Sequence, residues 1–192
     1  METVRLRDGS DVSIRAVEPA DRDAIRRSFE EMGPDSRYKR FLSPLDELTE
    51  SQLDYLTRVD HHDHEALVAL EGDLGVGVAR YVRLEHDGAR AEVAVAVIDD
   101  WQGRGLGTVL LERLSRRARE EGIAVFTAAV LAENQTVIEL LGRLGSTTAA
   151  PGGSGQIDLE IELEGDSLRE LMHHAASGAM HFAERIRTWR PR

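Results

Sequence analysis

The stretch AEVAVAVIDDWQGRGLGTVLLERLSRRAREE, residues 91–121, holds an apolar strand, a short acidic turn, a glycine run and a long amphipathic helix. Gly103, Gly105 and Gly107 leave main-chain N–H groups bare at the start of that helix, where an anion can approach them closely. The aligned peptide dipoles add partial positive charge at the same place. The stretch therefore predicts a site for a phosphate or pyrophosphate, and hence for a phosphorylated cofactor.

The helix after the glycines argues against a merely flexible turn. Its apolar residues recur at spacings of three and four, which gives one face that packs on a sheet. They are Leu106, Val109, Leu110, Leu114 and Ala118. Packing of this face fixes the amino end of the helix, as a preorganised anion site requires.

The spacing of the glycines narrows the choice of cofactor. A dinucleotide-binding loop needs Gly-x-Gly-x-x-Gly, whereas here the third glycine comes one residue early, and the chain has no Gly-x-x-x-x-Gly-Lys-Ser/Thr loop. The pattern that remains is Gln102-x-x-Gly105-x-Gly107 after a strand at residues 93–98. It resembles the acetyl-CoA pyrophosphate motif of the GNAT superfamily of N-acyltransferases. A second strand and Asn134 at the head of another helix strengthen the resemblance.

This resemblance covers about residues 12–163 and implies a fold and a donor site. We expect an α/β fold of the α+β type, in which a mixed, mostly antiparallel central sheet is flanked by helices on both faces. A single GNAT-like domain would span residues 1–165 and a C-terminal helical extension residues 166–192. In the superfamily the strand before the pyrophosphate loop splays from its neighbour and presents its main chain to the pantetheine arm. The implied acetyl-CoA-binding residues are Val95, Ala96, Val97, Gln102, Gly103, Arg104, Gly105, Leu106, Gly107, Thr108 and Asn134.

The rest of the chain is patterned as such a domain requires. Alternating and helical periodicities predict a hairpin around Gly9, helices at 19–32, 48–57 and 134–144, and strands at 66–70, 76–82, 125–131 and 157–163. A glycine-rich loop is expected at 151–155. Residues 167–174 and 179–189 are predicted to form one or two helices, which pack on the domain or serve as a homodimer contact.

Composition narrows the classes of function. With 192 residues and 41% hydrophobic content the chain can bury one core, and the absence of cysteine implies direct acyl transfer without a cysteinyl enzyme. A net charge of -11 and a single lysine, Lys39, argue against nucleic acid binding and favour an amine or a basic protein surface as acceptor. No membrane span or secretory signal is recognisable, so a cytoplasmic protein without a membrane partner is expected.

Glu92 is the candidate catalytic residue, because it is the only ionisable side chain in the strand at residues 91–98. A carboxylate at this position could take a proton from the ammonium group of the acceptor, directly or through a water. Two alternatives remain. Glu92 could meet solvent at the end of the strand, or it could pair with Arg80 or Arg83 on the neighbouring strand.

One further position affects how the thiolate could leave. In the superfamily a tyrosine seven residues after the asparagine often protonates the departing thiolate, but this chain has Leu141 there. Proton donation would then fall to water, or the low basicity of the coenzyme A thiolate would suffice.

Residues 60–65 read DHHDHE, yet their spacing is wrong for a clean metal site. We predict no metal there and interpret the segment as a polar loop, with a place beside the acceptor site as the alternative.

A closer resemblance comes from residues 6–9 (LRDG), 12–15 (VSIR), 36–41 (SRYKRF) and 91–94 (AEVA). Together they resemble the acyltransferase domain of bacterial protein lysine acetyltransferases. Those enzymes acetylate a lysine on acyl-CoA synthetases and related proteins, and several use a glutamate on this strand as base, which corresponds to Glu92. In relatives the domain is fused to a cyclic nucleotide domain or an acyl-CoA synthetase-like region. The resemblance implies a free-standing version, because neither partner fits within 192 residues.

The leading hypothesis is therefore an acetyl-CoA-dependent N-acetyltransferase that acts on a protein lysine. The first alternative is a small acceptor such as an amino acid, a polyamine or an antibiotic. The second is a protein that senses acyl-CoA without turning it over, since the tyrosine acid is missing.

Overall fold

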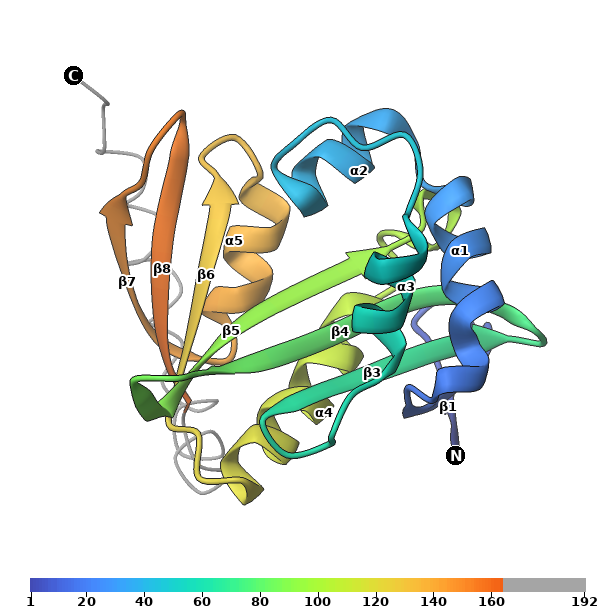
Figure 1. Cartoon of the computed structure of the whole chain (residues 1–192), viewed down its shortest axis with the longest axis horizontal. Helices are drawn as coiled ribbons and strands as arrows, with labels where there is room; N and C mark the ends of the chain where they lie inside the picture. Colours follow the sequence, from blue (N-terminus) through green and yellow to red (C-terminus); the bar gives the residue numbers. More distant parts are fainter. Residues whose placement is uncertain (164–192) are drawn as a thin grey trace.

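An eight-stranded sheet runs through residues 1–163, the part of the chain that the computed structural model describes (Figure 1). The strand order is β1-β2-β3-β4-β5-β6-β8-β7, and every neighbouring pair is antiparallel except the parallel pair β5 and β6. This confirms the predicted mixed, mostly antiparallel sheet. The strands β1 to β8 are Glu2–Arg5, Asp11–Ala16, His64–Glu71, Leu74–Leu84, Asp87–Val97, Val125–Leu131, Gly145–Pro151 and Gln156–Leu163.

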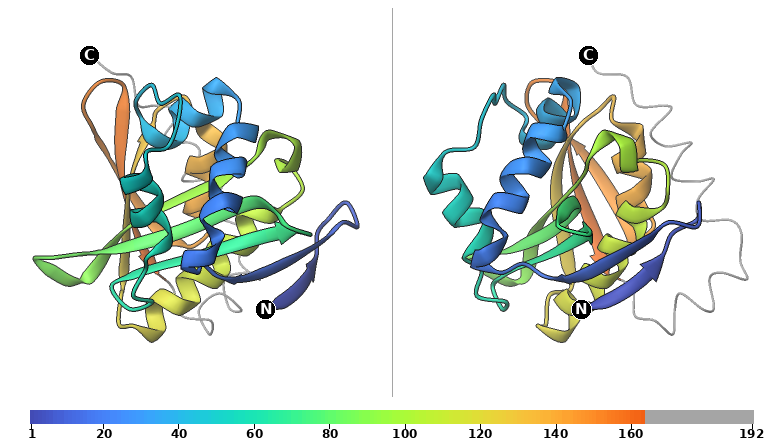
Figure 2. Two further views of the ribbon diagram at one scale, coloured as in Figure 1. Left: turned by 45° about the vertical axis from the view of Figure 1, so that its right-hand side comes forward. Right: turned by 90° about the vertical axis from the view of Figure 1, so that its right-hand side faces the viewer.

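Helices lie on both faces of the sheet, as expected for this fold class (Figure 2). Within residues 1–163 none of them is long and apolar enough to cross a membrane. The helices α1 to α5 are Arg22–Glu31, Pro34–Phe41, Glu50–Thr57, Leu106–Glu120 and Gln135–Gly142, with 3-10 turns at Pro19–Asp21 and Asp99–Trp101.

The two faces of the sheet bury separate cores because successive side chains of a strand point to opposite sides. On one face the side chains of α4 and α5 pack with Tyr81 of β4 and Phe126 of β6. On the other, Phe29 of α1 and Leu53 of α3 pack on Val68 of β3. The alternation also turns Arg80 of β4 toward α3, where it donates to a helix carbonyl. The face below α1 and α3 therefore carries a buried charge as well as an apolar core.

Two elements differ from the sequence prediction. Helix α2 was not predicted, because it has no buried residue and so lacks an apolar stripe. Strand β7 was not predicted either, because its residues are mostly exposed and show no apolar alternation. The predicted 151–155 loop follows it as the turn into β8. The predicted C-terminal helices lie outside the described residues.

The position of α4 depends on a glycine beneath it. A Cβ atom on Gly77 of β4 would lie 3.1 Å from both the Leu106 and the Leu110 side chains, and 3.4 Å from the Ala96 carbonyl oxygen. Both leucines are fully buried. The absence of a side chain on Gly77 therefore lets the first turns of α4 rest directly on the β4 and β5 strands.

We predict that Gly77→Val destabilises the fold. The added side chain overpacks the contact with α4, which typically costs about 1–3 kcal/mol. The free energy of unfolding in urea measures the effect. Gly88→Val is the matched control, because a Cβ on this strand glycine meets no atom within 4 Å. Equal losses in the two variants would contradict the role given to Gly77.

Candidate functional site

The strands β5 and β6 separate after a short stretch of pairing. Only residues 90–92 of β5 lie opposite residues 125–127 of β6; beyond them, in the described chain, β5 pairs with β4 and β6 pairs with β8. Figure 1 shows the two strands diverging toward α2. Val95, Ala96 and Val97 are half-buried along this open edge. Their main-chain groups on that side lack a strand partner and can serve a ligand.

The loop after β5 brings the amino end of α4 to the same gap. Gly103 and Gly105 have φ angles of +75° and +90°, a backbone conformation that favours glycine. Helix α4 begins at Leu106, so these two glycines precede it and only Gly107 lies within its first turn. The N-cap residue Gly105 contributes no side-chain hydrogen bond, and its carbonyl accepts from the Val109 N–H at 3.2 Å. The N–H groups before Val109 are left for an anion.

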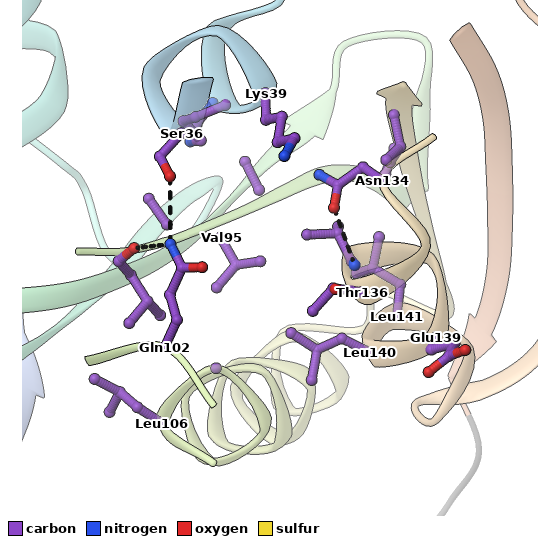
Figure 3. A pocket seen from close by; sticks show the side chains of 18 of the residues that line it. Ser36, Lys39, Val95, Gln102, Leu106, Asn134, Thr136, Glu139, Leu140 and Leu141 are labelled. Atoms are coloured by element: carbon purple, nitrogen blue, oxygen red, sulfur yellow. Dashed lines mark hydrogen bonds between the residues drawn. The ribbon is translucent and has the colours of Figure 1, made fainter. Parts of the chain in front are cut away.

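A cavity of about 770 Å³ joins the open strand to this loop. Small-molecule and cofactor sites typically have volumes of about 300–1,000 Å³. All of the predicted cofactor-binding residues line the cavity except Arg104, and Glu92 lines it too. Helix α2 forms a wall that the sequence did not reveal: Ser36, Lys39, Arg40 and Phe41 line the cavity from that side. Figure 3 shows Ser36 and Lys39 reaching in from α2.

The side chain of Arg104 is held outside the cavity. Its Nε and Nη2 donate to the Asp100 carbonyl at 3.0 and 2.6 Å, its Nη1 pairs with Asp8 at 3.0 Å, and its guanidinium lies 4.6 Å from the Trp101 ring. Arg7, from the turn between β1 and β2, lines the cavity instead. A Cβ atom on Gly105 would lie 3.2 Å from the Arg7 Nε. Arg7 is therefore the cation nearest the glycine loop on the cavity side, which the motif itself could not indicate.

Gln102 connects the glycine loop to the end of β5 and to α2. Its Nε2 donates to the Val97 carbonyl at 3.1 Å and to Asp99 Oδ1 at 2.9 Å. Asp99 in turn accepts from the Gly33 N–H at 3.1 Å and from the Ser36 hydroxyl. One carboxylate thus joins the start of α2 to the loop before α4.

Asn134 begins α5 on the opposite side of the gap. Its Oδ1 accepts from the Val137 N–H at 3.4 Å, which caps the helix. Figure 3 shows the Asn134 and Lys39 side chains pointing toward each other from α5 and α2. Leu141, which stands at the position of the superfamily tyrosine, is 2% exposed. Its side chain is part of the core and supplies no proton.

Glu92 is the last residue of β5 that pairs with β6. Its side chain is exposed and lines the cavity at the point where the strands part. Neither arginine on β4 pairs with it: Arg80 contacts His64 Nε2 and the Leu56 carbonyl, and Arg83 pairs with Asp63 at 2.6 Å. Within residues 1–163, Glu92 has no ion-pair partner, so the alternative of a pair with the neighbouring strand is wrong.

Residues 60–63 form a polar loop, His64 and Glu65 begin β3, and the segment is joined to the carboxyl end of α4. His61 Nδ1 lies 2.8 Å from Glu65, His62 contacts Glu121, and Arg117 donates to the His61 carbonyl at 2.8 Å. None of these loop residues lines the cavity. The polar-loop interpretation is confirmed for residues 60–63, whereas the last two residues of the segment belong to the strand. A place beside the acceptor site stays an untested alternative. In the described part of the chain no three potential metal ligands gather closely enough to hold an ion.

Comparison with known proteins identifies this arrangement. Residues 23–145 match the acetyltransferase (GNAT) family. The chain belongs to the GNAT acetyltransferase family. The enzyme is 37% identical over 145 residues to Acetyltransferase Pat of Mycolicibacterium smegmatis, an alignment that covers 74% of this chain and 43% of that relative. The chain therefore spans less than half the length of this relative.

Solved structures agree with the sequence match. The GNAT domain of S. lividans PAT superposes with a TM-score of 0.78 at 31% identity, which covers 84% of this chain and 96% of that one. At 22% identity the enzyme also shares the fold of yncA from Salmonella typhimurium, a structure with its cofactor acetyl-CoA. That superposition has a TM-score of 0.63 and covers 80% of this chain and 93% of yncA. The predicted GNAT fold is confirmed.

His64, beside Arg80, gives the stability of this GNAT enzyme a pH dependence. Burial, and then the Arg80 guanidinium, lower the pKa of His64 to about 4 despite the opposing charges of Asp60 and Glu65. The unfolded chain binds this proton near pH ~6.5. The contribution of His64 to stability is therefore complete above pH ~6.5 and is lost as the pH falls toward 4.

We expect the unfolding free energy to fall by about 1–2 kcal/mol between pH ~7 and ~4.5 because of His64, a range that allows for its partial exposure. Denaturant titrations at the two pH values measure it. His64→Gln should lose less stability than the wild type over this interval, whereas His86→Gln, in the exposed turn before β5, should behave like the wild type. Identical pH dependence in all three proteins would refute the assignment.

Proposed function

We propose that the enzyme transfers an acetyl group from acetyl-CoA to an amine, with the side chain of a protein lysine as the acceptor. One observation carries the donor half of this proposal: a strand edge without a partner and an uncapped helix amino end meet in a single cavity. The first suits the amide-rich pantetheine arm, and the second suits a pyrophosphate. The presence of acetyl-CoA in the yncA structure supports the same choice.

The donor would be held mainly by the main chain. The amides from Gly103 to Thr108 face the pyrophosphate, with the Arg7 guanidinium as a side-chain partner. Along Val95, Ala96 and Val97, the main-chain groups that point away from β4 serve the pantetheine arm, apart from the Val97 carbonyl that Gln102 occupies. Asn134 reaches the arm from α5. Gly107 lets α4 and α5 approach closely, since its Cβ would lie 3.0 Å from the Leu140 side chain.

The reaction needs a neutral amine beside the thioester. Glu92 is placed to accept the proton of the acceptor ammonium group, directly or through a water. The amine then attacks the thioester carbonyl, so that the C–N bond forms, the C–S bond breaks and the thiolate leaves with the electron pair. Because Leu141 is buried and carries no proton, the thiolate is protonated by water or leaves as the anion.

The acceptor side is open, which favours a protein over a small enclosed amine. The Glu92 side chain is exposed, and the exposed aromatic residues Tyr38 of α2 and Tyr55 of α3 lie on the elements that flank it. Tyrosine is enriched at protein interfaces because it combines a large apolar ring with a hydroxyl group. Similarity to the Pat acetyltransferases supports the same acceptor class.

The donor site is tested by Gly105→Val. A side chain here meets Arg7 and stands where the pyrophosphate would approach the amides, so affinity for acetyl-CoA should fall by about tenfold or more, measured by isothermal titration. Gly122→Val is the matched control: it has a similar positive φ of +78°, open space around its Cβ, and a place beyond the carboxyl end of α4. Unchanged affinity in Gly105→Val would place the pyrophosphate elsewhere.

The catalytic role is tested by Glu92→Gln. Loss of a general base typically lowers turnover by about 10²–10⁴-fold. We expect such a loss near neutral pH, measured by free thiol release with a lysine-containing protein, with little change in acetyl-CoA affinity. The loss should shrink at high pH, where the amine is deprotonated without help. Glu85→Gln, in the exposed turn before β5, controls for charge.

Wild-type turnover in Glu92→Gln would exclude Glu92 as the base. Tight binding of acetyl-CoA by the wild type with no acceptor-dependent thiol release would instead favour an acyl-CoA sensor. Faster release with free amines than with proteins would assign a small acceptor.

A further inference from the structure

Arg80 is a buried cation whose bonds are incomplete. It is 5% exposed, on the sheet face below α3, and lies opposite Ala94 of β5. Its Nη2 donates to the Leu56 carbonyl at 3.0 Å, and its Nη1 lies 3.1 Å from His64 Nε2. Its Nε is buried without a hydrogen-bond partner. His64 brings no negative charge, so Arg80 has no carboxylate partner within residues 1–163.

Arg40 is a second cation beside the same region, less buried than Arg80. It stands in the last turn of α2, half-buried, with its guanidinium 5.0 Å from the Phe41 ring. No hydrogen bond or ion pair joins its guanidinium to another described residue. Burial lowers the pKa of Arg40, while Glu92 and then Tyr55 act in the opposite direction. Arg40 also lowers the pKa of Arg80, after burial as the main cause. The Arg40 charge therefore reaches the Arg80 guanidinium.

Both arginines line a small side cavity of about 50 Å³. Its other walls are mostly apolar and come from α1, α3 and the sheet, with Phe29, Leu56 and Val78 among them. Four residues, Met32, Arg40, Phe41 and Ala96, line this cavity and the donor cavity alike. The side cavity therefore adjoins the point where the thioester would lie against Ala96. Its volume suits a group of a few atoms.

The positive charges of Arg40 and Arg80 beside the side cavity are not matched by a carboxylate at ion-pair distance among the described residues. A buried cation is costly unless an anion or several hydrogen bonds compensate it. Glu92, the carboxylate that acts on Arg40, lies beyond ion-pair distance and is the proposed base. Two guanidinium groups beside one apolar cavity form a natural receptor for a carboxylate, which accepts hydrogen bonds from several N–H groups at once.

We propose that Arg40 and Arg80 form a carboxylate subsite beside the acyl-transfer centre. The carboxylate belongs either to the acyl group of the donor, as in the monothioester of a dicarboxylic acid, or to the acceptor that carries the amine. This proposal rests on the proposed function and deepens it. The reaction keeps the same balance: one C–N bond forms, one C–S bond breaks, and the carboxylate is carried unchanged into the product.

The subsite is tested first without turnover. Glutarate, a free dicarboxylate, should raise the Tm of the wild-type protein, because a ligand that binds only the folded state stabilises it. Its uncharged diamide should have no effect. The stabilisation should disappear in Arg40→Gln, be partly retained in Arg40→Lys, and be unchanged in Arg58→Gln, which removes an arginine whose side chain is 73% exposed.

One comparison of binding affinities and one of kcat/KM values then identify the source of the carboxylate. If the acyl group carries it, succinyl-CoA should bind about tenfold or more tightly than acetyl-CoA in the wild type, and Arg40→Gln should abolish the difference. If the acceptor carries it, amines with a free carboxylate should exceed their amides in kcat/KM by a similar factor with acetyl-CoA, and the same variant should remove that preference.

Different outcomes of these experiments would reject the carboxylate subsite and the proposed donor site separately. Acetyl-CoA binding without any glutarate effect or carboxylate preference would overturn the subsite and leave the acyltransferase intact. A glutarate effect that depends on Arg40 in a protein without affinity for coenzyme A would support the subsite and refute the donor site. Equal glutarate effects in the wild type and Arg40→Gln would overturn the subsite in either case.

Discussion

The separation of β5 from β6 is the constraint on which the site depends. A strand edge without a partner costs free energy unless something satisfies its main-chain groups. At the end of β5 the Gln102 side chain does so, by donating to the Val97 carbonyl. The remaining open edge persists because α5, capped by Asn134, begins on the far side of the gap, and because α4 is anchored on Gly77. Helices α4 and α5 thus keep β5 and β6 apart, and the space between these two strands forms the binding cavity.

The glycine loop and helix α2, which form two walls of the site, are connected through Asp99. Asp99 comes two residues after the end of β5, precedes the glycine loop and binds the amino end of α2 through Gly33 and Ser36. Helix α2 carries Lys39 and Arg40, which line the cavity from the side opposite the sheet. Because α2 has no buried residue of its own, these polar contacts must contribute much of its positioning. The loop before α4 and the wall formed by α2 are therefore joined through Asp99.

Prediction from the sequence succeeded where local pattern and tertiary structure agree. The apolar stripe of α4, the alternation of β3 to β5 and the glycines at 103 and 105 are strong local signals, and they located the cavity. The prediction missed α2 and β7, whose residues are too exposed to show a period. It also listed Arg104 among the cofactor-binding residues without placing its side chain, which contacts with Asp8 and Trp101 hold outside the cavity while Arg7 lines it. Contacts between residues far apart in the sequence leave no trace in the spacing of residue types along the chain.

The charges of the site are more balanced than the charge of the whole chain. The net charge of -11 suggested attraction of a cationic acceptor, but among the described residues four basic side chains line the donor cavity beside four acidic ones, and Arg80 lies behind it. The basic side chains are Arg7, Lys39, Arg40 and Arg143, and the acidic ones are Asp35, Glu92, Asp99 and Glu139. Close cations disfavour a further positive charge and lower the pKa of an ammonium group that enters. In the proposed reaction this helps the acceptor reach the neutral form that attacks the thioester, while Glu92 receives the proton. The acidic surface can gather amines over a long range, whereas Arg40 and Arg80 favour their reactive form at short range.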